Sequence, residues 1–178
     1  MVTMRKTWIY AAVAFTLGYL LIGARPLCAQ GDCKLVLDAM TKVVSTPTHL
    51  YATMNLGGKN QAVETIYAGG GIYTRLDGKW SRSAMTMRDM AVLQQRNLNN
   101  NNAKPTCKYL KDELVNGEMT ALYSTHDVSP KGVTDTQTWI SKSKSLPLRQ
   151  ETDIDVGAGK GKSHMSSRYE YANVKAPM

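Results

Sequence analysis

Polar and apolar side chains alternate with a period of two along most of the chain from residue 50 onward, and short turn sequences interrupt the alternation. In an extended strand, successive side chains point to opposite faces, so this pattern predicts strands with one buried face. Asp77-Gly78 and Asn116-Gly117 each stand between two alternating runs, and both dipeptides favour tight two-residue hairpins. The pattern therefore predicts antiparallel hairpins and argues against strand–helix–strand crossover units.

The alternating runs and the turns between them predict about nine strands. Two segments have helical spacing instead: 33–44, with Asp32 as its cap and Leu35, Ala39, Met40 and Val43 on one face, and 86–98, with Met87, Met90 and Ala91 on one face. The expected fold class is α+β, with a strongly curved antiparallel sheet, an incomplete β-barrel, packed over these two helices. The expected strands are 50–56, 61–68, 72–76, 79–83, 107–115, 118–128, 134–141, 148–156 and 163–174.

The N-terminal sequence has the pattern of a secretory signal peptide. Arg5 and Lys6 precede an uncharged run over 7–22, and a small residue, Ala29, follows at a suitable cleavage position. We expect residues 1–29 to be removed and residues 30–178 to form a single domain in the periplasm. A retained membrane anchor is the alternative, whereas lipid attachment at Cys28 is disfavoured because Arg25 and Pro26 precede it.

Two cysteines, Cys33 and Cys107, remain after residue 29. In an oxidising compartment such a pair is expected to form one disulfide, worth about 4 kcal/mol in the chain-entropy model. Their wide separation does not match the close spacing of metal or redox motifs.

Removal of the first 29 residues removes three basic residues and so lowers the net charge of +8 by three. The remaining basic residues are interspersed with acidic ones, so we expect no nucleic-acid binding, while an anionic membrane surface stays open as a partner. We expect a monomer.

The stretch V-G-A-G-K-G-K-S over 156–163 ends like a phosphate-binding loop. The first glycine of that motif would stand at Val156, and the flanking residues alternate as strands where the motif needs a following helix. We therefore expect a surface turn between the last two strands and no nucleotide site, with Lys160 and Lys162 solvated.

No set of side chains in the sequence has catalytic or metal-binding spacing. His49, His126 and His164 fall on three different expected strands, and adjacent His126 and Asp127 must point to opposite faces. Arg149 shares one strand face with Glu151, Asp153 and Asp155, which we expect to be solvated or paired with Arg168 and lysines on the neighbouring strand. No enzyme activity, cofactor or metal is expected.

Two stretches resemble bacterial periplasmic lipoprotein carriers, the LolA-like superfamily of outer-membrane lipoprotein-sorting proteins. They are E-T-I-Y-A-G-G-G-I-Y-T-R-L-D-G-K-W over 64–80 and W-I-S-K-S-K-S-L-P-L-R-Q-E over 139–151. The first matches the Y-x-x-x-D-G-x-W hairpins of that superfamily, and the second its G-L-P-L-R motif, with Ser145 replacing the usual glycine. The resemblance covers most of the chain after residue 29 in element order.

The resemblance implies a half-barrel whose cavity holds lipid or the acyl chain of an acylated protein. Seven methionines, whose flexible side chains adapt to irregular ligands, are consistent with such a cavity, although they could equally fill a core that lacks phenylalanine. The alternative function is a protein-interaction module with a filled core that uses its open sheet. Alternation and size select the expected lining: Tyr73, Trp80, Met87, Met90, Tyr123, Tyr169 and Tyr171.

Overall fold

The computed structural model describes residues 29–177 except 57, 101–104, 131 and 158–161. The predicted signal peptide therefore lies, but for Ala29, outside the described residues. The elements are α1 (Ala29–Val43), β1 (Thr48–Leu56), β2 (Lys59–Ala68), β3 (Gly71–Leu76), β4 (Lys79–Thr86), α2 (Met87–Asn100), β5 (Thr106–Val115), β6 (Glu118–Ser129), β7 (Gly132–Ser141), β8 (Pro147–Asp155) and β9 (Lys162–Glu170).

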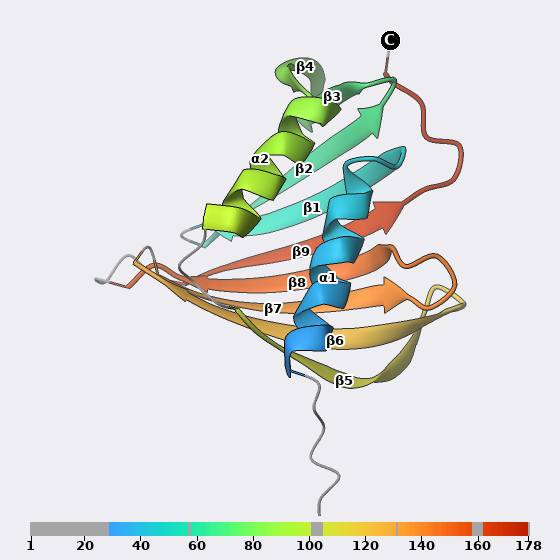
Figure 1. Cartoon of the computed structure of the whole chain (residues 1–178). Coiled ribbons are helices and arrows are strands. Elements are labelled where there is room, and N and C mark those ends of the chain that lie inside the picture. Colours follow the sequence, from blue (N-terminus) through green and yellow to red (C-terminus); the bar gives the residue numbers. More distant parts are fainter. Residues whose placement is uncertain (1–28, 57, 101–104, 131, 158–161, 178) are drawn as a thin grey trace, which may run out of the picture.

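All nine strands form one antiparallel sheet in the order β4-β3-β2-β1-β9-β8-β7-β6-β5. Figure 1 shows that this sheet is strongly twisted and curved, and that both helices lie on the same side of it. The predicted α+β class, the curved antiparallel sheet and its two helices are confirmed.

The tight turns form where the sequence predicts them. Asp77-Gly78 and Asn116-Gly117 both have two consecutive positive φ angles, of 50° and 79° and of 50° and 80°. Two positive φ values match the mirror-image turn that follows the natural twist of a hairpin, and Gly accepts such angles at little cost. These turns set the register of β3 with β4 and of β5 with β6.

The strand order explains why the barrel is incomplete. Because β1 pairs with both β2 and β9, the two edges of the sheet are β4 and β5, which are consecutive strands in the chain. The connection between them, residues 87–105, must therefore run from one edge of the sheet to the other. Eight strand spacings correspond to about 38 Å in a flat sheet, and a 14-residue helix supplies about 21 Å of that span. Helix α2 is thus a strap that bridges the open side of the sheet.

Helix α1 packs against the half of the sheet that contains β5 to β8. Its buried positions are Val36, Ala39 and Val43, whereas Leu35 is 53% exposed, so the expected place of Leu35 on the core face was wrong. The helix starts before Asp32, which does not cap it as predicted but accepts a hydrogen bond from the backbone N–H of Tyr109 in β5 at 3.0 Å. Because β5 is an edge strand, this buried carboxylate satisfies a donor that no neighbouring strand can reach.

The predicted disulfide between Cys33 and Cys107 is confirmed. It joins α1 to β5 across a sequence separation of 74 residues, close to the Asp32 contact. The disulfide and the hydrogen bond together fasten the N-terminal helix to one edge of the sheet.

Candidate functional site

Strand register divides the expected cavity lining between two faces of the sheet. We call the face that packs against α1 the helix face and the opposite one the outer face. Tyr123 lies on the helix face, because it packs with α1, and the chain of cross-strand partners places Tyr169 on the same face. The same register puts Tyr73 and Trp80 on the outer face, so they cannot line a cavity beneath the helices.

On the outer face, the two misplaced aromatic residues cover the sheet near β4. The indole of Trp80 lies 6.2 Å from the imidazole of His49, and the guanidinium of Arg82 lies 5.9 Å from the ring centre of Tyr73. Gly71 is packed closely by the Tyr73 ring. The error arose because alternation says which residues share a face but not which of the two faces meets the helices.

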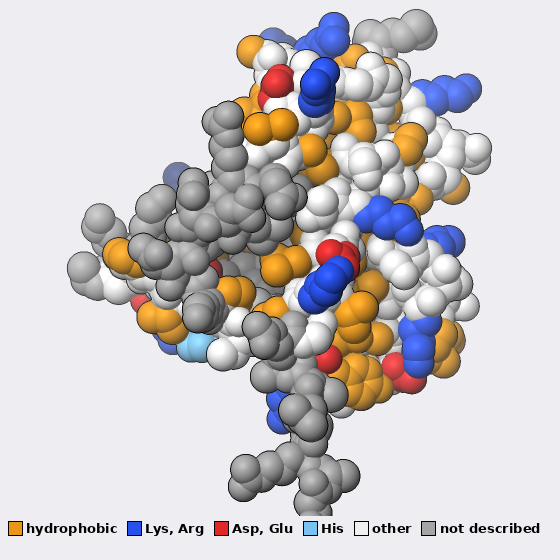
Figure 2. Space-filling view, in the orientation of Figure 1, with side chains coloured by type: hydrophobic (Ala, Val, Ile, Leu, Met, Phe, Trp, Pro, Cys, Tyr) orange, Lys and Arg blue, Asp and Glu red, His pale blue; other side chains and the backbone are white. Residues whose placement is uncertain are grey.

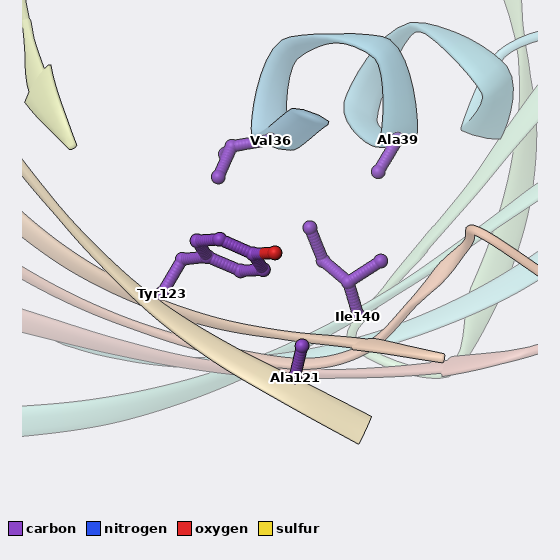
Figure 3. Packing of buried hydrophobic residues seen from close by; sticks show 5 residues of the cluster. All are labelled: Val36, Ala39, Ala121, Tyr123 and Ile140. Carbon is purple, nitrogen blue, oxygen red and sulfur yellow. The ribbon is translucent and has the colours of Figure 1, made fainter. Parts of the chain in front are cut away.

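The helix face beneath α1 is filled. Val36 and Ala39 of α1 meet Tyr123, Ile140 and Ala121 of the sheet, and Figure 3 shows these side chains converging in one cluster. All five are at most 9% exposed. Tyr123 is therefore a core residue, with no room beside α1 for a ligand to reach it.

Next to this cluster, the floor of the helix face is polar but internally satisfied. The Tyr169 hydroxyl donates to Oε1 of Gln150 at 3.1 Å, and the Gln150 amide donates to the Thr138 hydroxyl at 3.3 Å. Burial raises the pKa of Tyr169 well above its usual range, so its hydroxyl keeps its proton and stays a donor. This buried network is structural, because its polar groups already have partners.

Tyr171 directly follows β9 in the chain. Its hydroxyl donates to the carbonyl of Pro147 at 2.5 Å, and burial raises its pKa. Like Tyr169, it is held by the protein and is not free to contact a ligand through its hydroxyl.

Between α1 and α2, the helix face carries apolar side chains that stay half-exposed. Met54 of β1 and Met165 of β9 are directly opposite each other, and Ala52 and Leu50 follow along β1. Figure 2 shows apolar side chains at the surface on this side of the molecule. We call this surface the thioether strip; its members are Leu50, Ala52, Met54, Val63 and Met165.

On helix α2, Met87, Met90 and Ala91 are half-buried, whereas Arg88, Asp89 and Val92 around them are exposed. The strand of the sheet that α2 contacts most is β4, which precedes it in the chain. Met87 and Met90, two of the expected lining residues, therefore lie on the more buried side of α2.

The outer face of β6 to β9 carries a polar groove of about 740 Å³. The sequence predicts only a solvated face here. His164 lies between two carboxylates of β8, with Nδ1 2.8 Å from Asp153 and Nε2 3.0 Å from Glu151. Asp153, followed by Glu151, raises the pKa of His164 and so stabilises its charged form. The predicted shared face of Arg149, Glu151 and Asp153 is confirmed. On β9, Glu151 and Asp153 pair with His164 and not with Arg168, whereas Asp155 pairs with Lys162, as predicted for a lysine of the neighbouring strand.

The neighbouring residues His126 and Asp127 lie on opposite faces of the sheet, as the alternation predicts. His126 points outward and pairs with Asp135 at 2.7 Å, and Asp127 points to the opposite face. Within the described ranges, no group of three or more histidine, cysteine or acidic side chains is placed to hold a metal ion. The Ser166 hydroxyl donates a hydrogen bond to Glu151 at 2.8 Å.

The phosphate-loop-like stretch joins β8, which ends at Asp155, to β9, which begins at Lys162. It therefore connects two antiparallel strands and does not open a helix. Most of the turn itself, residues 158–161, lies outside the described residues. Of the helices that the structure describes, none is long and apolar enough to span a membrane.

No protein-family model matches the chain, and no curated protein matches it. The structures similar to it include MucB, with a TM-score of 0.44 and 10% identity over 83% of this chain; the chain spans 60% of the length of MucB. MucB has also been solved in complex with the periplasmic part of MucA, and this structure gives a TM-score of 0.43 at 9% identity, with 83% of this chain and 57% of that chain covered.

A putative outer membrane lipoprotein-sorting protein domain from Vibrio parahaemolyticus is similar as well, with a TM-score of 0.29 and 9% identity over 80% of this chain and 93% of that one. At TM-scores below 0.5, however, none of these likenesses establishes what the chain binds, so its function has to be argued from its own residues.

Proposed function

We propose that the chain is a non-enzymatic binding protein that holds an acyl chain against the thioether strip, beneath the strap formed by α2. The observation that carries the proposal is the half-exposed row of Met54, Met165 and Ala52 on a sheet face that is elsewhere sealed by α1. Unbranched, polarizable thioethers adapt to a flexible apolar ligand better than branched side chains do.

The position of α2 supports the same proposal. The strap contacts the sheet at β4, and its half-buried Met87 and Met90 would form the second apolar surface against which an acyl chain lies. The lining proposed here replaces Tyr73 and Trp80 by Met54 and Met165 and keeps Met87 and Met90. Tyr123, Tyr169 and Tyr171 serve as the filled wall beside it.

We further propose that the protein acts as a monomer in the periplasm. Residues 1–29 would serve as the export signal and residues 30–178 as the single mature domain. The cargo would be a lipid or an acylated protein.

Uptake of a fluorescent fatty acid by the purified protein tests the proposal. We expect saturable uptake, weakened about tenfold or more in Met54→Glu and Met165→Glu, because each change removes apolar contact and sets a carboxylate beside the acyl chain. Met119→Glu is the matched control, since Met119 is 49% exposed and lies at the far end of β6. Uptake that is absent from the unaltered protein, together with no lipid in native mass spectra, would rule the proposal out.

A protein-interaction module remains the second candidate, because the α1 half of the helix face is already filled. In that case the fatty acid would not bind. The Met54→Glu change would instead weaken the binding of a protein partner.

A further inference from the structure

On the outer face, Arg149 of β8 and Arg168 of β9 are directly opposite partners in the sheet. Like charges at directly opposite positions of neighbouring strands destabilise a sheet. Both side chains are about half exposed, with 51% and 49% of their surface accessible. The pair therefore needs stacking partners or negative charge close by.

Each guanidinium is held over an aromatic ring. That of Arg168 lies 4.3 Å from the ring centre of Tyr51, and that of Arg149 lies 4.7 Å from that of Trp139. The indole N–H of Trp139 donates in turn to Glu113 at 2.9 Å, which fixes the ring. Stacking restrains the arginines and leaves the N–H groups at the guanidinium edges available to a ligand.

The carboxylates around the pair do not use all of these donors. Glu151 accepts from Arg149 Nε at 2.9 Å, from His164 Nε2 at 3.0 Å and from the Ser166 hydroxyl at 2.8 Å. Arg168 donates to Glu170 through Nη1 alone. In the part of the chain that the structure describes, no side chain accepts a hydrogen bond from the terminal nitrogens of Arg149 or from Nη2 of Arg168.

A groove of about 380 Å³ opens beside these free donors. Tyr51, Thr53 and Ser166 line it with the two arginines, and the β5–β6 turn at Asn116 borders it. Two guanidinium groups on adjacent strands present donor pairs that match the oxygens of a tetrahedral anion, for which arginine is suited by its planar fork.

We propose that Arg149 and Arg168 form a binding site for a phosphate group, supplied either by free phosphate or by the headgroup of an anionic lipid. The site lies on the opposite face of the sheet from the thioether strip and does not depend on the function proposed above. A bound phosphate would relieve the repulsion between the two arginines and engage their remaining donors.

Calorimetric titration with inorganic phosphate, and co-sedimentation with phosphatidylcholine vesicles with and without phosphatidic acid, test the site. We expect saturable binding of at least one probe, weakened about tenfold or more in the Arg149→Gln/Arg168→Gln variant, because both donor pairs are lost. Arg82→Gln is the matched control, since Arg82 also lies over an aromatic ring but outside the groove. This control should bind as the unaltered protein does.

Binding of vesicles but not of inorganic phosphate would identify a lipid headgroup as the source and would still support the site, if the double variant abolishes it. The proposal is overturned if neither probe binds more tightly than about 10 mM, or if Arg82→Gln weakens binding as much as the double variant. Thermal unfolding establishes whether each variant folds. If the double variant does not fold, the single variant Arg168→Gln is tested in its place.

Discussion

At the scale of single residues, His164 is the side chain whose environment departs most from a simple exposed strand position. It is half exposed, yet both of its ring nitrogens face carboxylates of β8. Because Asp153 and then Glu151 raise its folded-state pKa, the stability gained from the charged imidazole is fully present below about pH 6.5 and is lost as the pH rises through the raised value.

The Asp153→Asn change should lower the pKa of His164 toward its ordinary value, since the hydrogen bond to Asp153 is the largest cause of the shift. NMR titration of the imidazole protons measures this directly. The unfolding midpoint in urea should also depend less on pH between about 6 and 9 in the variant than in the unaltered protein. Asp135→Asn, which removes the partner of His126 instead, is the control and should leave the His164 titration in place.

Ser145 illustrates a second residue-scale effect. It stands where the resembling carriers have glycine, and its φ of 54° lies in the left-handed region that glycine adopts readily. The turn is held by hydrogen bonds from the backbone N–H of Ser145 to the carbonyl of Ser141 and from the N–H of Ser141 to the carbonyl of Leu146, both 2.9 Å. These two hydrogen bonds offset the conformational cost of placing a non-glycine residue at a positive φ.

At the scale of elements, the strap α2 depends on its N-terminal cap more than a helix packed along its whole length would. Thr86 Oγ1 accepts from the N–H of Asp89 at 3.2 Å, and Asp89 accepts in return from the N–H of Thr86 at 2.9 Å. These reciprocal bonds form a capping box. The hydrogen bonds that the Asp89 carboxylate accepts from the N–H and the hydroxyl of Thr86 lower the pKa of Asp89.

Thr86→Ala should therefore loosen α2 with little effect on the rest of the sheet. The expected cost is about 1 kcal/mol, the usual value for losing a threonine cap. Amide hydrogen exchange should accelerate in residues 88–92 while β6 and β7 keep their protection. Thr53→Ala, an exposed strand substitution, serves as control, and equal acceleration across the sheet would contradict a local role for the cap.

At the scale of the whole molecule, the Cys33–Cys107 disulfide links helix α1 to β5, an edge strand of the sheet. The Cys33→Ser/Cys107→Ser variant should lose about 4 kcal/mol of unfolding free energy, because a loop of this length is no longer closed in the unfolded chain. Chemical unfolding measures the loss, and the unaltered protein under reducing conditions should match the variant. Two alkylatable thiols in the oxidised protein would show that the bridge does not form.

The sequence by itself determined most of the secondary structure. Turn residues such as Asp77-Gly78 and Asn116-Gly117 fix where hairpins reverse, and the change from a period of two to helical spacing marks α2 to within a few residues. These signals are local, since each depends on the backbone preferences of a few neighbouring residues. The pairing of two isolated cysteines also follows from sequence, because no other partner remained after residue 29.

Only the tertiary structure decided which sheet face meets the helices and which side chains lie beside one another. Alternation assigned Tyr73 and Tyr123 equally well to a cavity, yet the register of the five intervening strands places them on opposite faces. The apposition of Arg149 with Arg168, and that of Met54 with Met165, likewise arises from pairing between strands distant in sequence or joined by long turns. Such contacts depend on the register of the entire sheet, and a period-two pattern carries no information about that register between strands.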